Sequence, residues 1–305
     1  MCRGNDDMKY YIGIDIGGTN LRAAILNENY IIIDKLIIEN EVESGPKYNL
    51  GKLVSIIKEK WLDKEIIGVG VGCPGPLDIK NGKILVAPNL KTWEYFNVKE
   101  FLSKELNLQV KVNNDANVAA LSEAIMGSGK GCESVYYITL STGIGGGFIY
   151  KGEIVSGFNS IAAEVGNMII NEDCYKHKNM NYGGFEGQCS GTNISRIASK
   201  VMGRKITTKE VFDSARSGNN DLVNVINNWI INISKAIANI VITVDPEVIV
   251  LGGSVILNNK EYIEFIKEEV EKRIFDGIKV NIKLASMGGD TGLIGAGILL
   301  ASPKF

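Results

Sequence analysis

The chain has 305 residues, of which 45% are hydrophobic and 22% charged, the balance of an ordinary globular protein, and this length allows one large or two medium domains. The formal net charge of −2 implies no basic surface, so we expect no nucleic-acid partner. No apolar run approaches the roughly 18 residues of a membrane span, so we expect no membrane partner.

The cysteines favour a reducing compartment over a disulfide framework. The chain has five, an odd number, and no two of them form a CxxC pair. Residues 1–7 are polar and lack the apolar core of a signal peptide. We therefore expect a cytoplasmic protein.

Hydrophobic periodicity predicts alternating strands and helices along the whole chain. The predicted strands cover residues 10–16, 21–26, 30–38, 66–72, 84–87, 110–112, 135–140, 148–150, 168–170, 248–251 and 279–285. The predicted helices cover residues 50–62, 98–106, 193–202, 222–242, 262–275 and 292–300, and another begins after Asp115. No low-complexity linker separates these elements.

Two glycine hairpins repeat one pattern, in which an apolar strand is followed by a polar residue, a glycine tip and a second apolar strand. The first tip is Gly17-Gly18-Thr19-Asn20, and the second lies within residues 141–147. Such a tip can bring backbone N–H groups against an anion, although a glycine hairpin without any ligand has the same pattern. Asp15, just before the first tip, could hold a metal ion through water. The repetition suggests two related lobes.

Two further glycine patterns resemble nucleotide motifs but do not fit them. Gly70-x-Gly72-x-x-Gly75 matches the dinucleotide fingerprint, yet prolines at positions 74 and 76 prevent a helix where the pyrophosphate would need one. The segment 127–131 lacks the register of a phosphate-binding loop, so we predict a surface turn there.

Asn113, Asn114 and Asp115 lie where the strand 110–112 gives way to a helix. Short polar side chains at this position are typical helix N-caps, and a cap role alone would explain them. An Asp here is also oriented by two rigid elements, and the positive end of the helix favours its ionised form. The glycine hairpins on either side favour a catalytic carboxylate at Asp115.

Five segments occur in the order found in the sugar-kinase and actin-like ATPase superfamily, namely 15–20, 114–115, 142–147, 251–254 and 292–297. Within it, residues 141–147 and Glu164-Val-Gly166 resemble the ROK family (repressors, open reading frames and kinases). The resemblance implies an α/β, two-lobed ribonuclease H-like (actin-like ATPase) fold with the active site in the interlobe cleft. The smaller N-terminal lobe would comprise residues 8–115 plus 290–305, and the larger C-terminal lobe residues 116–289.

The same resemblance implies an ATP-dependent kinase that phosphorylates the 6-hydroxyl of a hexose, with glucose the favoured substrate, and a homodimer. Asp115 would be the base and Asp15 would position Mg²⁺. The residues that would contact ATP are Gly17, Gly18, Thr19, Thr142, Gly143, Gly145, Gly252 and Gly253. The residues that would bind sugar hydroxyls are Asn89, Asn114, Glu164, Asn167 and Glu186.

Two departures from the family pattern concern metal and sugar binding. Asn167 replaces a family His and can still hydrogen-bond a hydroxyl. The usual zinc-binding cysteine cluster is replaced around residues 182–185, and only Cys174, His177 and Cys189 are nearby. We interpret these three as surface-loop residues and one buried cysteine, so zinc is not expected.

Other functions stay open at this stage. The substrate could be fructose, mannose, N-acetylmannosamine or N-acetylglucosamine, or the chain could be a non-catalytic sugar-binding member of the family. A repressor would need a helix-turn-helix of several tens of residues before Asp15, where only 14 residues stand, so we do not expect DNA binding.

Overall fold

The computed structural model describes residues 8–87 and 90–301, which form two compact units. The first unit contains the described residues up to Met126, residues 152–160 and the described residues from Met287 onwards. The second contains residues 127–151 and 161–286. Helix α3 (Asp115–Ile125) belongs to the first unit, beyond the predicted lobe boundary at residue 115, because it packs on α10 (Thr291–Ile298).

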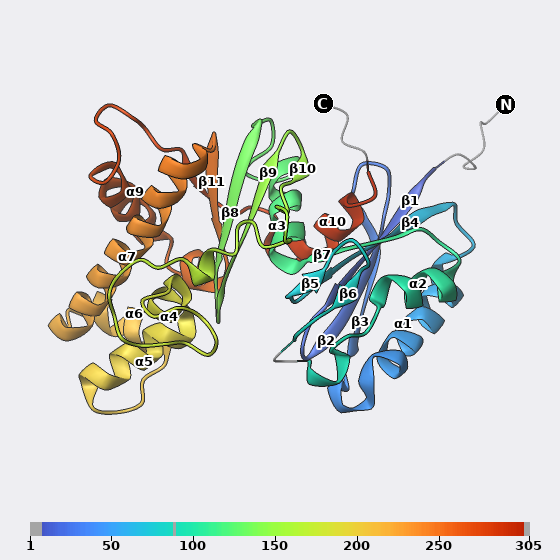
Figure 1. The fold of residues 1–305 in the computed structure, drawn as a ribbon, viewed down its shortest axis with the longest axis horizontal. Coiled ribbons are helices and arrows are strands. Elements are labelled where there is room, and N and C mark those ends of the chain that lie inside the picture. Colours follow the sequence, from blue (N-terminus) through green and yellow to red (C-terminus); the bar gives the residue numbers. More distant parts are fainter. Residues whose placement is uncertain (1–7, 88–89, 302–305) are drawn as a thin grey trace. The chain divides into compact units, whose positions relative to one another are not determined.

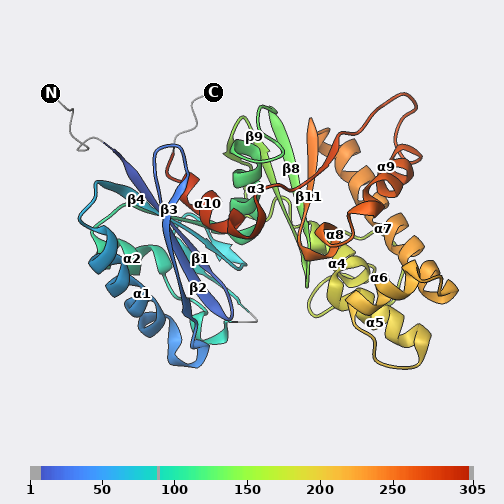
Figure 2. The same ribbon diagram turned by 180° about the vertical axis from the view of Figure 1, so that it is seen from behind.

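The first unit is built on a sheet with the strand order β3-β2-β1-β4-β7 (Figure 1). Its strands are β1 (Tyr10–Ile16), β2 (Asn20–Leu26), β3 (Ile32–Glu39), β4 (Ile66–Cys73) and β7 (Val110–Asn114). Strand β2 is antiparallel to β1 and β3, whereas β4 is parallel to β1 and β7. Helices α1 (Gly45–Trp61) and α2 (Val98–Leu106) cover one face and α10 covers the other (Figures 1 and 2).

Glycines allow α10 to pack directly on backbone atoms. A Cβ at Gly13 would lie 2.0 Å from the Leu293 carbonyl oxygen, and one at Gly70 would lie 1.7 Å from that of Ala296. On the α3 side, a Cβ at Gly295 would lie 1.7 Å from the Val118 carbonyl oxygen. No side chain fits at these distances, so Gly70 in the apparent dinucleotide fingerprint is a packing glycine.

The second unit repeats this arrangement with the strand order β9-β8-β11-β12. The strands are β8 (Ser134–Leu140), β9 (Ile144–Tyr150), β11 (Val248–Gly252) and β12 (Ile282–Leu284). As in the first unit, an antiparallel hairpin (β8–β9) is followed by parallel strands. The predicted repetition of glycine hairpins is therefore confirmed.

The helices of the second unit are α4 (Phe185–Cys189), α5 (Gly191–Met202), α6 (Thr208–Arg216), α7 (Asn220–Val244), α8 (Ser254–Leu257) and α9 (Ile263–Glu271). Helices α4, α5, α6 and α9 pack against α7, the longest of them. By length and composition α7 could cross a membrane, but 61% of its most apolar 18-residue window is buried inside the protein. A buried core helix has the same composition, so this helix is weak support for a membrane span.

Several predicted elements were wrong in extent or missing. The strand predicted at 84–87 is limited to β6 (Lys83–Ile84), which pairs with β5 (Leu77–Asp78). Residues 168–170 form no strand, and Ile169 makes only an isolated bridge to Gly184. The last strand, predicted at 279–285, is limited to β12. A short strand that was not predicted, β10 (Glu153–Ile154), lies in the 152–160 segment of the first unit. Helix α6 was not predicted, although Thr207 and Glu210 form a capping box at its start.

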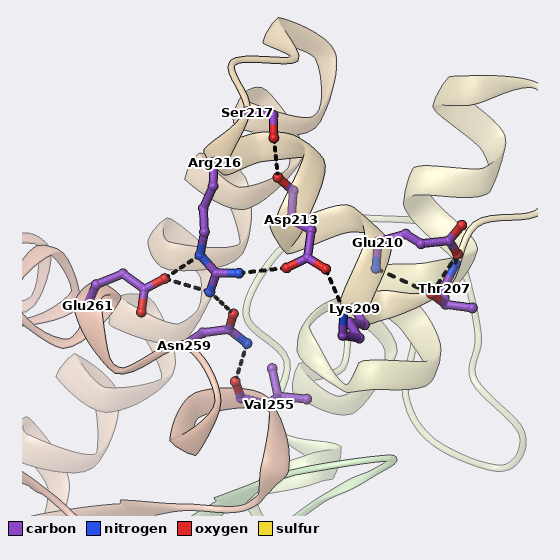
Figure 3. A network of polar contacts seen from close by, with 9 residues as sticks. All are labelled: Thr207, Lys209, Glu210, Asp213, Arg216, Ser217, Val255, Asn259 and Glu261. Carbon is purple, nitrogen blue, oxygen red and sulfur yellow. Dashed lines mark hydrogen bonds and ion pairs between the residues drawn. The ribbon is translucent and has the colours of Figure 1, made fainter.

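A polar network joins α6 to the segment that follows α8 (Figure 3). Arg216 donates from Nε to Glu261 Oε1 at 2.8 Å and from Nη1 to Asp213 Oδ1 at 3.0 Å, and it also contacts Asn259 Oδ1. Asn259 is only 6% exposed and donates from Nδ2 to the Val255 carbonyl oxygen at 2.6 Å. The Asn259 amide thus links α8 to α6.

We predict that Asn259→Ala lowers the free energy of unfolding by about 1–3 kcal/mol, because it removes the partners of the Arg216 guanidinium and the Val255 carbonyl. Urea unfolding monitored by circular dichroism measures this loss. The control is Asn258→Ala at the exposed neighbouring position, where we expect a change within about 0.5 kcal/mol. Equal losses for the two variants would contradict the role of the buried amide.

Candidate active site

The predicted polar residues of the first unit follow three neighbouring parallel strands. Asp15 on β1 pairs with Gly72 on β4, and Gly72 pairs with Asn113 on β7. The segments after these strands therefore lie at one carboxyl edge of the sheet, where α/β proteins bind ligands. Burial raises the pKa of the Cys73 thiol, and the negative charges of Asp115 and Asp15 raise it further, so both carboxylates lie near this residue.

Asn114 and Asp115 begin helix α3. The Oδ1 atoms of both residues accept from the Ala116 N–H, at 2.8 Å and 2.7 Å respectively. Asn114 is half-buried, and a Cβ at Gly75 would lie 3.1 Å from its Nδ2 atom. The cap role is therefore confirmed for Asn114, whereas Asp115 is exposed at the start of the helix.

Asp15 is half-buried and paired with Arg22, which lies opposite it on β2. Arg22 Nε donates to Asp15 Oδ2 at 2.9 Å, and Nη1 donates to the Gly289 carbonyl oxygen at 2.8 Å. The sequence analysis did not identify Arg22. Its opposite charge across a tight hairpin was the available signal.

The first glycine turn is held at its base and exposed at its tip. Gly17 N–H donates to the Asn20 carbonyl at 2.9 Å. Asn40 donates from Nδ2 to the Gly17 carbonyl at 2.7 Å and from its backbone N–H to the Thr19 carbonyl at 2.8 Å. Gly18 and Thr19 are exposed. A rigid turn with an open tip suits anion binding.

In the second unit, parallel pairing of β8 with β11 brings the turn at 141–143 near Gly252 and Gly253. Thr142 is exposed at this turn, and Gly145 lies on β9 opposite Thr139. Gly253 has φ +87°, and a Cβ there would lie 2.4 Å from the Leu140 carbonyl oxygen. Packing within the unit therefore requires glycine at this position with or without a ligand.

Glu186 on α4 is the centre of a buried polar cluster. The residue is 8% exposed, and its Oε2 accepts from the Ile144 N–H at 2.7 Å. A Cβ at Gly143 would lie 2.8 Å from the same oxygen, so the glycine makes room for the carboxylate. Partial desolvation and the negative charge of Glu186 raise the pKa of Glu164, which indicates that the two carboxylates are neighbours.

Of the two predicted sugar-binding residues Asn167 and Asn89, the structure describes only the first. The side-chain Oδ1 of Asn167 accepts from the Asn181 N–H at 2.7 Å, and its carbonyl oxygen accepts from Asn181 Nδ2 at 3.0 Å. Asn167 thus anchors the irregular segment that precedes α4. Asn89 lies outside the described residues.

The prediction that His177 is a surface-loop residue was wrong. His177 is 7% exposed, and its Nε2 lies 3.3 Å from Glu186 Oε1. Cys174 is exposed and Cys189 is buried, as predicted. Within residues 8–87 and 90–301, no three His, Cys, Asp or Glu side chains are grouped to hold a metal ion.

Comparisons with known proteins agree over nearly the whole chain. A glucokinase from Halalkalibacterium halodurans is 32% identical, covering 96% of this chain and 95% of that protein. An N-acetyl-D-glucosamine kinase from Haemophilus influenzae is 29% identical, covering 95% of this chain and 98% of that protein. The crystal structure of the ROK hexokinase from Thermus thermophilus superposes with a TM-score of 0.89 at 28% identity, covering 96% and 97% of the two chains.

A ROK glucokinase from Streptomyces griseus, solved with glucose and AMPPNP, superposes with a TM-score of 0.74 at 26% identity, covering 95% of this chain and 98% of that one. The neighbours have the predicted actin-like ATPase fold. Residues 11–302 match the ROK family. The chain is therefore a member of the ROK family, as its ordered motifs indicated.

Proposed function

We propose that this protein transfers the γ-phosphoryl group of ATP to the 6-hydroxyl of a hexose, with glucose the favoured substrate. The observation that carries the proposal is the carboxyl edge of the first unit, where Asp115 follows β7 and the open glycine turn 17–19 follows β1. Full-length similarity to glucokinases supports the same activity.

Asp115 would act on the attacking hydroxyl. Phosphoryl transfer asks the protein mainly for positioning and charge neutralisation, so a single oriented carboxylate is sufficient on the acceptor side. The N-terminus of α3 stabilises negative charge on Asp115 and makes it a weak base. We therefore expect Asp115 to orient the hydroxyl first and to accept its proton late in the reaction.

The two glycine turns would bind the nucleotide. Backbone N–H groups around residues 17–19 and 142–145 are suited to the phosphates, and the glycine pair at 252–253 to the adenosine. The Streptomyces griseus relative was solved with an ATP analogue, which supports ATP as the donor.

Asp15 fits a magnesium ion as one carboxylate ligand. Arg22 contacts Oδ2, so Oδ1 is the oxygen that would hold the ion or one of its waters. Magnesium in nucleotide sites takes one or two carboxylates and completes its shell with phosphate and water, which agrees with a single protein carboxylate here. When bound, the ion would neutralise charge on the transferring phosphate.

The polar cluster of the second unit would bind the sugar. Glu164 and Glu186 offer neighbouring carboxylates, which accept hydrogen bonds from vicinal hydroxyls. Because Asn167 Oδ1 accepts a hydrogen bond from the Asn181 N–H, the Asn167 N–H₂ group is the one that could reach a hydroxyl. Relatives named as kinases of N-acetylglucosamine and N-acetylgalactosamine make these sugars the main competitors of glucose.

We predict ADP release with at least one hexose when the protein is assayed with Mg-ATP and a panel of sugars. The panel contains glucose, mannose, fructose, N-acetylglucosamine, N-acetylmannosamine and N-acetylgalactosamine. We expect the highest kcat/KM with glucose. Sugar binding is measured in parallel by calorimetry. Binding without turnover would identify a non-catalytic sugar-binding protein, and turnover best with an N-acetylated sugar would correct the substrate.

We predict that Asp115→Asn lowers kcat about 10²- to 10⁴-fold, the usual contribution of a general base, while the affinity for ATP stays within about twofold. The matched control is Asp63→Asn, an exposed carboxylate that precedes β4 and so lies at the opposite, amino edge of the sheet. A near-normal kcat for Asp115→Asn would show that another group is the base.

A further inference from the structure

The orientation of the Asn193 amide is set by three neighbours. Its Oδ1 accepts from Arg196 Nε at 2.9 Å, and its Nδ2 donates to the Glu186 backbone carbonyl and to Ser190 Oγ, both at 2.9 Å. Rotating the amide by 180° would place its N–H₂ against the guanidinium and its oxygen against a carbonyl. Nδ2 therefore faces His177 Nδ1, which lies 3.2 Å away.

This donor determines the protonation of His177. The two hydrogens of the Asn193 N–H₂ group are shared among three neighbours. Because this group cannot accept, a proton on His177 Nδ1 would face a donor, so the ring is neutral with its proton on Nε2. Tyr175 provides a second, longer contact to Nδ1 at 3.4 Å. The protonated Nε2 then lies 3.3 Å from Glu186 Oε1, within ion-pair distance.

The charged groups around His177 also favour the neutral ring. Burial lowers the pKa of His177, the positive charges of Lys178 and Arg196 lower it further, and Glu186 raises it. The Arg196 guanidinium lies 3.4 Å over the centre of the Tyr175 ring, next to the imidazole. A positive charge on the imidazole would therefore lie close to the positive charge of Arg196.

We infer that His177 is a positioning residue for hexose binding, which fixes the Glu186 carboxylate through its Nε2–H group and thereby sets the affinity for the sugar. The inference rests on the proposed function, because it takes Glu186 as a hydroxyl-binding group. Each Glu186 oxygen has one polar neighbour: the Ile144 N–H donates to Oε2, and His177 Nε2 lies 3.3 Å from Oε1. Each oxygen keeps a further lone pair for a sugar hydroxyl.

Fixing the Glu186 carboxylate before the sugar binds should increase the affinity for the sugar. A glutamate without these donors would lose side-chain freedom when the sugar binds, and this cost would weaken binding. His177 lies in a segment that forms no helix or strand. The hydrogen bonds between Asn167 and Asn181 anchor this segment. The neutral ring adds no positive charge beside Glu186.

The test compares His177→Leu, which removes the donor, with His177→Gln, whose amide can replace the Nε2–H group. For the best hexose of the panel, we expect His177→Leu to raise KM and the calorimetric Kd for the sugar roughly tenfold. We expect KM for ATP to change less than about twofold. His177→Gln should return the sugar KM to within about threefold of the wild type. Glu172→Ala, at an exposed position on the same segment, is the control and should have wild-type values.

The outcomes separate this inference from the proposed function. A folded His177→Leu variant with unchanged sugar KM and Kd would overturn the inference alone, as would a failure of His177→Gln to restore them. If the wild type binds a hexose without turnover, the kinase proposal fails and the Kd series still decides the role of His177. A wild type that neither binds nor phosphorylates any hexose would overturn both.

A measurement without substrate tests the geometry directly. His177 is the only histidine, so its imidazole gives one set of NMR signals. We predict ¹⁵N shifts of the Nε2–H tautomer at pH 7 and a pKa below 6.5. An Nδ1–H tautomer would contradict the inferred contact of Nε2–H with Glu186, and a pKa at or above 6.5 would contradict the inferred neutral ring.

The same lowered pKa predicts a pH dependence of stability. Between 6.5 and the folded-state pKa, the unfolded chain binds the proton more tightly than the folded protein does. The contribution of His177 to the free energy of unfolding is therefore complete above 6.5 and is lost as the pH falls through that range. His177→Gln should remove this part of the dependence in urea unfolding at several pH values.

Discussion

The candidate catalytic groups of the first unit depend on the contact of α10 with backbone atoms on both of its sides. On one side α10 meets β1 at Gly13, two residues before Asp15, and on the other Gly295 meets α3 at Val118, three residues after Asp115. These contacts contain no flexible side chain, so they fix the end of β1 relative to the start of α3. Glycine at positions 13 and 295 is thus a condition for the placement of both carboxylates.

In the second unit the main constraint is the carboxylate of Glu186, which is almost completely buried. Burying a charge is costly unless it has polar partners, and Glu186 accepts from the Ile144 N–H and contacts His177 Nε2. Neither group carries a full positive charge when the ring is neutral. The Glu186 carboxylate therefore has polar neighbours without a strong ion pair.

Local patterns in the sequence predicted the strands, the repeated glycine hairpins and the junction at Asp115, because alternation, glycine tips and helix caps depend on neighbouring residues. The burial of His177 was not predictable in this way. It lies in a polar segment without periodicity, and it is buried by Glu186 on α4 and Asn193 on α5. The missing strand at 168–170 has the same cause, since Asn167 and Ile169 contact Asn181 and Gly184 rather than a neighbouring strand.

The two glycine hairpins share a pattern but use their glycines differently. In the first, the tip at Gly18 and Thr19 is exposed and only the base of the turn is held by Asn40. In the second, Gly143 makes room for the Glu186 carboxylate, and the adjacent Gly253 packs on the Leu140 carbonyl. Glycine at these two positions is explained by packing alone. The glycine pattern therefore supports phosphate binding more strongly in the first hairpin, whereas in the second it brings the turn at 141–143 against the Glu186 carboxylate.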